Sequence, residues 1–339
     1  MQQASNAFAL ATLLATLTAT CASAAAPPRG PLNAVDLGAV GDGKADDTAA
    51  LQAAIDQAKA TSRALYIPHG TYRITKPIQI ALRTYAWRPL RVTSDWATIQ
   101  AAAEMDACVV CDISAWLTLE RLRIDAAGLA QHGVKMFKIS TARSLTQQVD
   151  VVNARSHGWV LEKCQIPRFV ACTASHNAGD GWRIIDCNAA TFAGCSAMAN
   201  QANGFTVTRK DYSGGCVLRS THAEKNKGHG IFIDGTASPV LVDGGWIEGN
   251  ALDGVRVGAV DVVLRGLGVT GIGQNDNRAI RLLKGSSGCH VSACYVQRGG
   301  GAVEYAGIRL EAAPKHNVIE GNFNRYNGWR VEAEVVGGE

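Results

Sequence analysis

Histidine, aspartate and arginine side chains recur at regular intervals through the middle of the chain. A histidine beside a carboxylate and an arginine can transfer a proton as a general acid or base. We expect His229, Asp180, His157 and Arg256 to be catalytic. The alternative is that aspartate, asparagine and histidine fill tight turns for conformational reasons. Three of these candidates belong to a first row of polar positions, which reads His132, His157, Asp180, Asn203, His229, Asp253 and Arg278.

A second row of side chains predicts a surface for an anionic partner. It takes the middle residue of each of eight short triplets, and alternation along a strand points that residue outward. Five of the eight are cationic and one is aromatic, so stacked triplets would form a ribbon of positive charge. The alternative is a solvated strand face that happens to use arginine. The row reads Lys135, Val160, Arg183, Thr206, Phe232, Arg256, Arg281 and Arg309.

The substrate-binding candidates come from this second row and from one loop. The segment from Thr208 to Gly215 falls in the longest interval of the repeat described next, so we expect a loop over the charged face there. Tyr212 on this loop could serve as an acid. The candidates are Arg183, Phe232, Arg281, Arg309, Lys135, Lys210 and Tyr212.

A repeat of asparagines positions both rows. The intervals between Asn177, Asn200, Asn226, Asn250 and Asn275, by subtraction of their numbers, are 23, 26, 24 and 25 residues. A fixed period of this size is typical of solenoids, in which each coil buries its apolar face against its neighbours. The triplets alternate with period two, which indicates strands, and stacked asparagine amides can hydrogen-bond along the stack. The sequence therefore predicts an all-β fold, a right-handed parallel β-helix.

The N-terminal part of the chain predicts export and a capping helix. Residues 1–26 carry no charged side chain and end in small residues before a proline pair, which resembles a secretory signal peptide. The mature protein would then be secreted or periplasmic, without a membrane span. Residues 48–60 carry Leu51, Ala54, Ile55 and Ala58 on one face, which indicates an amphipathic helix covering the open end of the solenoid. We expect residues 31–335 to form a single domain of this 339-residue chain.

The residues around this helix resemble a known family. The run Asp36-x-Gly38-Ala39-x-Gly41-Asp42-Gly43-x-x-Asp46-Asp47-Thr48 is followed by Leu65-Tyr66-Ile67-Pro68-x-Gly70-x-Tyr72. This pattern is similar to that of the pectate-lyase-like β-helix superfamily, which includes polygalacturonases, polysaccharide lyases and phage tailspikes. The resemblance implies the fold and a polysaccharide partner, but it leaves the reaction open.

Comparison with polygalacturonases weakens the case for hydrolysis. Asn177 to Asp180 and Gly228-His229-Gly230 resemble two of their motifs, but Ala202-Asn203 stands where an aspartate pair is expected. β-Elimination instead needs a base near the uronate C5 proton and a cation that neutralises the carboxylate. His229 or His157 as base, with Arg183 and Arg256 as neutralisers, would meet that need. We therefore expect a lyase acting on an acidic polysaccharide, with a hydrolase or a non-catalytic polysaccharide-binding β-helix as alternatives.

Other partners are less favoured by the sequence. The chain carries no Lys/Arg cluster of the kind that binds nucleic acid. We expect no cofactor, because a calcium bridge would need a cluster of acids and Asp180, Asp234 and Asp253 are dispersed. Nine cysteines remain after Cys21, and we expect them to pack as small apolar residues in the core, with disulfides as the alternative. The oligomeric state stays open.

Overall fold

The structure is a computed structural model, and it describes residues 30–81, 89–112, 116–138, 144–209, 214–235, 237, 239–272, 277–296, 307–311, 316–323 and 334–335. Pro31–Glu339 form one compact unit. The predicted signal peptide, Lys210 and Tyr212 lie outside the described residues.

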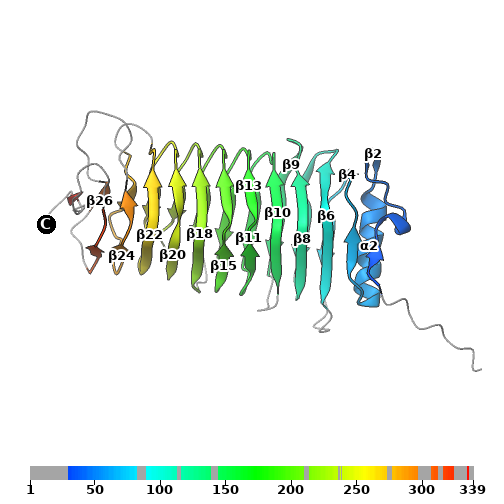
Figure 1. Ribbon diagram of the computed structural model, residues 1–339, viewed down its shortest axis with the longest axis horizontal. Helices are drawn as coiled ribbons and strands as arrows, with labels where there is room; N and C mark the ends of the chain where they lie inside the picture. The colour runs from blue at the N-terminus through cyan, green and yellow to red at the C-terminus, as the bar shows by residue number, and fades with distance from the viewer. Residues whose placement is uncertain are drawn as a thin grey trace, which may run out of the picture. The chain divides into compact units, whose positions relative to one another are not determined.

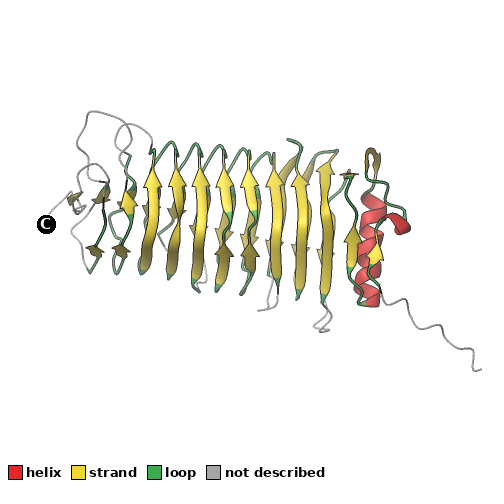
Figure 2. Ribbon diagram, in the orientation of Figure 1, coloured by secondary structure: helices red, strands yellow, loops and turns green. Residues whose placement is uncertain are grey.

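Two parallel sheets form the solenoid, and their strands stack side by side from the blue end to the red end of the chain (Figures 1 and 2). The large sheet contains β1 (Leu32–Asn33), β2 (Asp42–Asp46), β3 (Leu65–Ile67), β4 (Thr71–Ile74), β6 (Leu90–Ala101), β8 (Leu117–Asp125), β10 (Leu145–Val152), β12 (Arg168–Val170), β13 (Thr173–Ser175), β15 (Ala190–Ala193), β16 (Ser196–Met198), β18 (Cys216–Glu224), β20 (Val240–Glu248), β22 (Val262–Thr270), β24 (His290–Ser292), β25 (Tyr295–Val296) and β27 (Val318–Glu320). The small sheet contains β5 (Ile78–Ala81), β7 (Met105–Asp112), β9 (Ala130–Phe137), β11 (Trp159–Glu162), β14 (Trp182–Ile185), β17 (Phe205–Thr208), β19 (Ile231–Ile233), β21 (Val255–Val257), β23 (Ile280–Leu282), β26 (Ile308–Leu310) and β28 (Glu334–Val335). This architecture confirms the predicted parallel β-helix.

Residues with left-handed backbone turn the chain inside the long strands of the large sheet. Ser220 in β18, Gly244 in β20 and Gly266 in β22 occupy equivalent positions and have φ of 50°, 67° and 64°. The alternation of buried and exposed residues is interrupted there: Arg219 and Ser220 are both exposed. One left-handed residue therefore changes the strand direction, and glycine fills this position in two of the three coils because it adopts positive φ without steric cost.

The predicted capping helix is confirmed as α2 (Thr48–Thr61), and Figure 1 shows it at the N-terminal end of the stack. Its buried residues are the four that the sequence pattern placed on one face. In the segment before it, Val35–Leu37 form a short 3-10 helix, η1. Apolar burial against the first coil holds α2 in place, so the helix covers backbone edges that could otherwise pair with another chain.

A buried asparagine ladder crosses the coils. Asn177, Asn200, Asn226 and Asn250 are all at most 1% exposed. In each step, the side-chain Oδ1 of the following asparagine accepts from both the backbone N–H and the Nδ2 of the preceding one, at 2.8–3.1 Å. Each coil thus supplies the acceptor that satisfies a buried amide of the coil before it.

Large side chains fill the interior beside this ladder. Trp159, Trp182 and Phe205 stack on successive coils, with ring centroids 4.8 and 5.9 Å apart. Phe169 and Phe192 form a second stack at 5.0 Å. All nine cysteines among the described residues are buried thiols without a disulfide, which agrees with the prediction that they pack as small apolar residues in the core. Burial raises the pKa of Cys111 to about 12, which leaves this thiol unreactive.

We expect Asn226→Ala to destabilise the protein by about 2–6 kcal/mol, the sum for two buried groups. The change leaves the amide of Asn200 and the carbonyl of Ala197 buried without these partners, at roughly 1–3 kcal/mol each. Urea unfolding monitored by circular dichroism measures the loss. Gln201→Ala, at an exposed position on a neighbouring turn, is the control, and equal stability of the two variants would contradict a structural role for the ladder.

Candidate functional site

The outward row predicted from the triplets lies in register on the small sheet. Val160 pairs with Arg183, Arg183 with Thr206, Thr206 with Phe232, and the pairing continues to Arg309. Adjacent members of the row are therefore about 4.8 Å apart. Arg183 and Arg256 lie three coils apart, or about 14 Å, and their side chains are each 34% exposed.

The row of polar residues that begins at His132 forms a ladder of its own, apart from the asparagine ladder. In it, side-chain acceptors bind backbone donors. The N–H of each residue donates to the side chain of the equivalent residue one coil earlier, at 2.8–3.1 Å. We call this set the polar ladder. Its members are His157, Asp180, Asn203, His229, Asp253 and Arg278, where Arg278 contributes its N–H.

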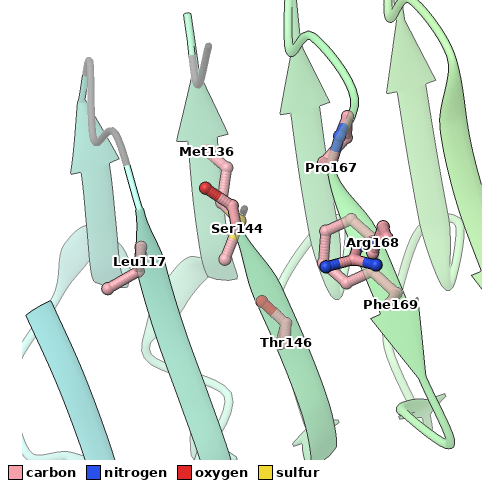
Figure 3. A pocket seen from close by; sticks show the side chains of 7 residues that line it. All are labelled: Leu117, Met136, Ser144, Thr146, Pro167, Arg168 and Phe169. Carbon is pink, nitrogen blue, oxygen red and sulfur yellow. The ribbon is translucent and has the colours of Figure 1, made fainter. Parts of the chain in front are cut away.

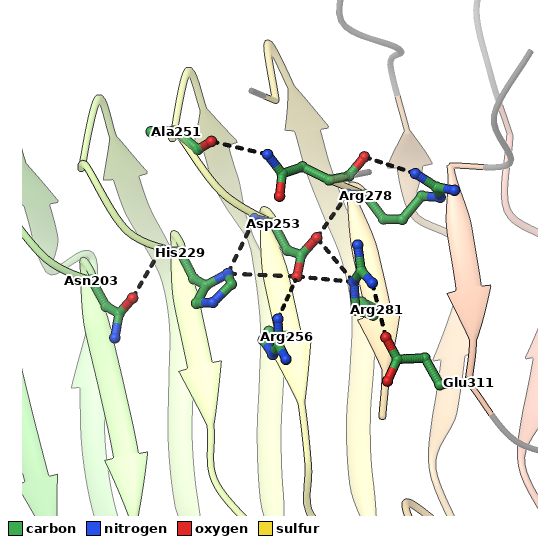
Figure 4. A network of polar contacts seen from close by, with 9 residues as sticks. Asn203, His229, Ala251, Asp253, Arg256, Arg278, Arg281 and Glu311 are labelled. Carbon is green, nitrogen blue, oxygen red and sulfur yellow. Dashed lines mark hydrogen bonds and ion pairs between the residues drawn. The ribbon is translucent and has the colours of Figure 1, made fainter. Parts of the chain in front are cut away.

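One cluster on this ladder joins three side chains and one backbone N–H around Asp253, as Figure 4 shows. Oδ1 of Asp253 accepts from the Arg278 N–H at 2.8 Å, and Oδ2 lies 3.1 Å from Nε of Arg281. Nη1 of Arg256 lies 3.5 Å from the same Oδ2. His229 lies on the other side of Asp253, with its Nδ1 accepting from the Asp253 N–H at 3.1 Å. The carboxylate therefore fixes both arginines beside the histidine.

The same arrangement occurs three coils earlier. His157 accepts at Nδ1 from the Asp180 N–H at 2.9 Å, and Arg183 donates from Nη1 to Oδ2 of Asp180 at 3.1 Å. The ring of His157 stacks on His132 with centroids 5.7 Å apart. Between the two clusters, Asn203 takes the ladder position and donates from Nδ2 to Thr206. The His-Asp-Arg cluster is thus duplicated, with a neutral coil between the copies.

The ladder sets the protonation of both histidines. Desolvation lowers the pKa of His229 below its usual 6.5, against the pull of the Asp253 carboxylate, and the pKa of His157 is lowered for the same reason. An Nδ1 that accepts a hydrogen bond carries a lone pair, so the neutral ring holds its proton on Nε2. Among the described residues nothing hydrogen-bonds to Nε2 of either ring. Each ring therefore presents a neutral N–H donor.

The structure brings together most of the predicted residues but changes their relations. His157 contacts Asp180, another of the catalytic candidates, whereas His229 contacts Asp253, which was not among them. Arg281 is 7% exposed and bound to Asp253 and Glu311, which differs from the open position that the row pattern predicts. Lys135 is paired with Asp106 at 3.0 Å. The spacing of Asp253, three residues before Arg256, was the signal that could have identified it, since Asp180 precedes Arg183 in the same way.

The remaining candidates share the row without joining a cluster. The Phe232 ring lies 5.6 Å from the His229 ring, so it borders the second cluster. Arg309 is half-buried and follows Arg281 in the register. These two residues extend the surface on which the arginines lie.

Two cavities along the solenoid differ greatly in size. The pocket in Figure 3, between Leu117, Ser144 and Phe169, holds about 10 Å³, room for about one water. A wide, open pocket of about 520 Å³ lies over turns at Asn153, Arg155 and Gln201. In the described part of the chain no group of three or more His, Cys, Asp or Glu residues could hold a metal ion. No helix among the same residues has the length and apolar character needed to cross a membrane.

We predict that His157→Asn/His229→Asn flattens the dependence of stability on pH. A histidine whose pKa is lowered by folding binds its proton first in the unfolded chain. The contribution of the neutral histidine to the free energy of unfolding is therefore complete above about pH 6.5. It is lost as the pH falls toward the pKa of the histidine in the folded state. Asparagine keeps an acceptor in the ladder, as Asn203 does, but does not titrate.

Urea midpoints at pH 8 and pH 5 measure this effect. The wild type should lose more stability between them than the double variant. His176→Asn, at an exposed position with φ of 59°, controls for the change in histidine content. An unchanged pH slope in the double variant would show that the ladder histidines are not held neutral.

Comparisons with known proteins agree with this architecture. A family model described as rhamnogalacturonase A/epimerase, pectate lyase-like, matches residues 32–85, and a right-handed β-helix region matches residues 107–263. The chain is 57% identical to alginate lyase 7 of Azotobacter vinelandii over 44 residues, which are 13% of this chain and 5% of the relative. It is 54% identical to mannuronan C5-epimerase AlgE3 of the same organism over 44 residues, 13% of this chain and 2% of the relative. These matches therefore span only a small part of the curated relatives.

A solved structure extends the likeness to most of the solenoid. The A-module of Azotobacter vinelandii mannuronan C-5 epimerase AlgE4 superposes with a TM-score of 0.67 and 18% identity, covering 90% of this chain and 96% of that one. At this identity the likeness concerns the fold alone. The family models, the register of the two sheets and the capping helix agree: the chain belongs to the pectate-lyase-like group of right-handed parallel β-helix proteins.

Proposed function

We propose that this protein acts on an acidic polysaccharide outside the cytoplasm, as a lyase that cleaves uronate chains by β-elimination. The observation that carries the proposal is that a partly exposed arginine and a neutral histidine contact the same buried carboxylate, Arg256 and His229 on Asp253. The local similarity to an alginate lyase and to mannuronan epimerases supports a uronate as substrate.

The cluster around Asp253 suits the carboxylate of a uronate. Arg256 neutralises the negative charge of the carboxylate, and the Nε2–H of His229 donates to the charge that grows there when the neighbouring C–H proton leaves. A neutral imidazole with a lowered pKa is a suitable electrophile for such a step. The carboxylate of Asp253 holds Arg256 in place and also binds Arg281, whose charge is balanced in turn by Glu311.

This assignment changes the role that the sequence suggested for the histidines. With Nδ1 occupied by a backbone amide, His229 offers a donor at Nε2 and no lone pair that could accept the substrate proton. The base must then come from another residue. We propose Tyr212, which the sequence suggested as an acid and which lies outside the described residues, as this base; Tyr212→Phe should abolish turnover while uronate binding is kept.

The cluster at His157 is assigned to binding. Arg183 lies about 14 Å from Arg256 along the row, so it can hold a second carboxylate of the same polymer. Hydrolysis is disfavoured by the same geometry. Asp180 and Asp253 are three coils apart and both are bound to arginine, whereas a glycosidase needs two carboxyl groups roughly 5–9.5 Å apart.

Incubation with polymannuronate, polyguluronate and polygalacturonate tests the proposal. At least one polymer should yield unsaturated ends that absorb ultraviolet light. His229→Asn and Arg256→Gln should each lower kcat/KM by about 10²–10³, since each removes a donor to the developing charge. Arg183→Gln should mainly raise KM, because it removes a contact that binds the substrate equally well in the ground state and in the transition state.

Two outcomes would contradict the proposal. Uronate binding without any product would favour a non-catalytic polysaccharide-binding protein. Exchange of substrate hydrogen with deuterated solvent, without unsaturated ends, would indicate inversion at the same carbon in place of cleavage. His176→Asn is the matched control, because it makes the same chemical change at an exposed histidine outside the polar ladder.

A further inference from the structure

Three aromatic side chains form an exposed strip on the large sheet, on different strands from the arginine row. Trp246 lies on β20, Tyr295 on β25, and Phe323 pairs with Tyr295 through a single bridge after β27. Trp246 is 43% exposed and Phe323 is 50% exposed, while Tyr295 is half-buried. We call these three residues the aromatic strip. Its strands lie toward the yellow and orange part of the solenoid in Figure 1.

The rings form a continuous surface because the coil between Trp246 and Tyr295 has a glycine, without a side chain, at the position in register with them. Trp246 is in register with Gly268, and Gly268 with Tyr295. Two coils would separate the rings by about 9.6 Å at the strand spacing. The Trp246 and Tyr295 centroids are instead 6.3 Å apart at an interplanar angle of 19°, and the Tyr295 and Phe323 centroids are 5.4 Å apart. Trp246 leans over Gly268, where an added Cβ would lie 2.2 Å from Cε3 of the tryptophan.

A polar contact holds the first ring of the strip in place. The indole Nε1 of Trp246 donates to Oε2 of Glu248 at 2.9 Å. The tryptophan is therefore not a loosely placed surface residue, since it is oriented by one contact and seated on a glycine. An exposed, oriented ring of this kind presents an apolar face at low cost in conformational entropy.

Size and charge indicate which occupant fits this strip. Three rings of about 150–250 Å² each, roughly half exposed, offer about 300 Å², far below the ~800 Å² per partner of a stable protein interface. The charged side chain in contact with the strip is Glu248, whose carboxylate would repel a polyanion. A row of rings along the solenoid axis matches an extended polymer that has one apolar face.

We propose that the aromatic strip is a second glycan-binding surface, which takes an uncharged run of pyranose rings by stacking on their C–H faces. This surface is separate from the arginine row, which suits carboxylates. The protein would then hold a glycan at two places: anionic residues on the small sheet and neutral residues on the large sheet. This inference does not depend on the reaction proposed for the clusters.

Calorimetric titration of the full chain with cellohexaose, laminarihexaose and maltohexaose tests the strip. We expect the wild type to bind at least one of these neutral probes. Trp246→Ala should weaken binding about tenfold, the change that corresponds to about 1.4 kcal/mol. Gly268→Ala should weaken it as well, although every ring is kept, because the new methyl group displaces the flexible end of Trp246.

Two controls separate this proposal from that for the arginine row. Val170→Ala, an exposed apolar position on β12 of the same sheet, should leave affinity for the neutral probe unchanged. Arg256→Gln should also bind the neutral probe as the wild type does, whatever its effect on uronates.

Absence of binding to all three probes would overturn the proposal, and so would wild-type affinity in both Trp246→Ala and Gly268→Ala. Sedimentation of the wild type as a dimer that Trp246→Ala dissociates would likewise overturn it, in favour of contact between two copies of the chain.

Discussion

Parallel strands stacked in register bring equivalent residues of successive coils within about 4.8 Å of each other, and this constraint shapes the rest of the molecule. Near the turns before the strands of the small sheet, backbone N–H groups point at a neighbouring coil and need acceptors: those of the asparagines point at the coil after, and those of the polar ladder point at the coil before. Asn177 to Asn250 supply acceptors in the interior, and His157, Asp180, Asn203, His229 and Asp253 supply them closer to the surface. The second set satisfies the same need with side chains that can also do chemistry.

This dual use explains why the candidate site is repeated. A ladder position accepts any side chain with a suitable acceptor, so histidine, aspartate and asparagine can replace one another there without loss of the hydrogen bond. Where aspartate occupies it, the arginine three residues later is drawn to the carboxylate, as in Asp180–Arg183 and Asp253–Arg256. Where asparagine occupies it, the partner is Thr206 and the coil is neutral. The chemistry of each coil thus follows from one residue.

The sequence was sufficient to predict the fold because the repeat encodes it directly. The asparagine spacing identified the coils, the triplets identified the strands of the small sheet, and the pattern of Leu51, Ala54, Ile55 and Ala58 identified the capping helix. The site was predicted less completely, because period alone does not say which of two neighbouring coils a side chain contacts. His229 contacts Asp253 of the following coil, whereas Asn203 occupies the coil before it, and Arg281 is buried by its two carboxylate partners. The aromatic strip was missed because Gly268 separates its members in the register.

The central claim is that a backbone amide fixes the tautomer of the ladder histidines, so that His229 presents a neutral Nε2–H beside Arg256. Nitrogen chemical shifts of the histidine rings, measured by NMR at pH 7, test this claim most directly. We expect His229 and His157 to show an unprotonated Nδ1 that accepts a hydrogen bond and a protonated Nε2. A protonated Nδ1, or a charged imidazolium at this pH, would contradict the account.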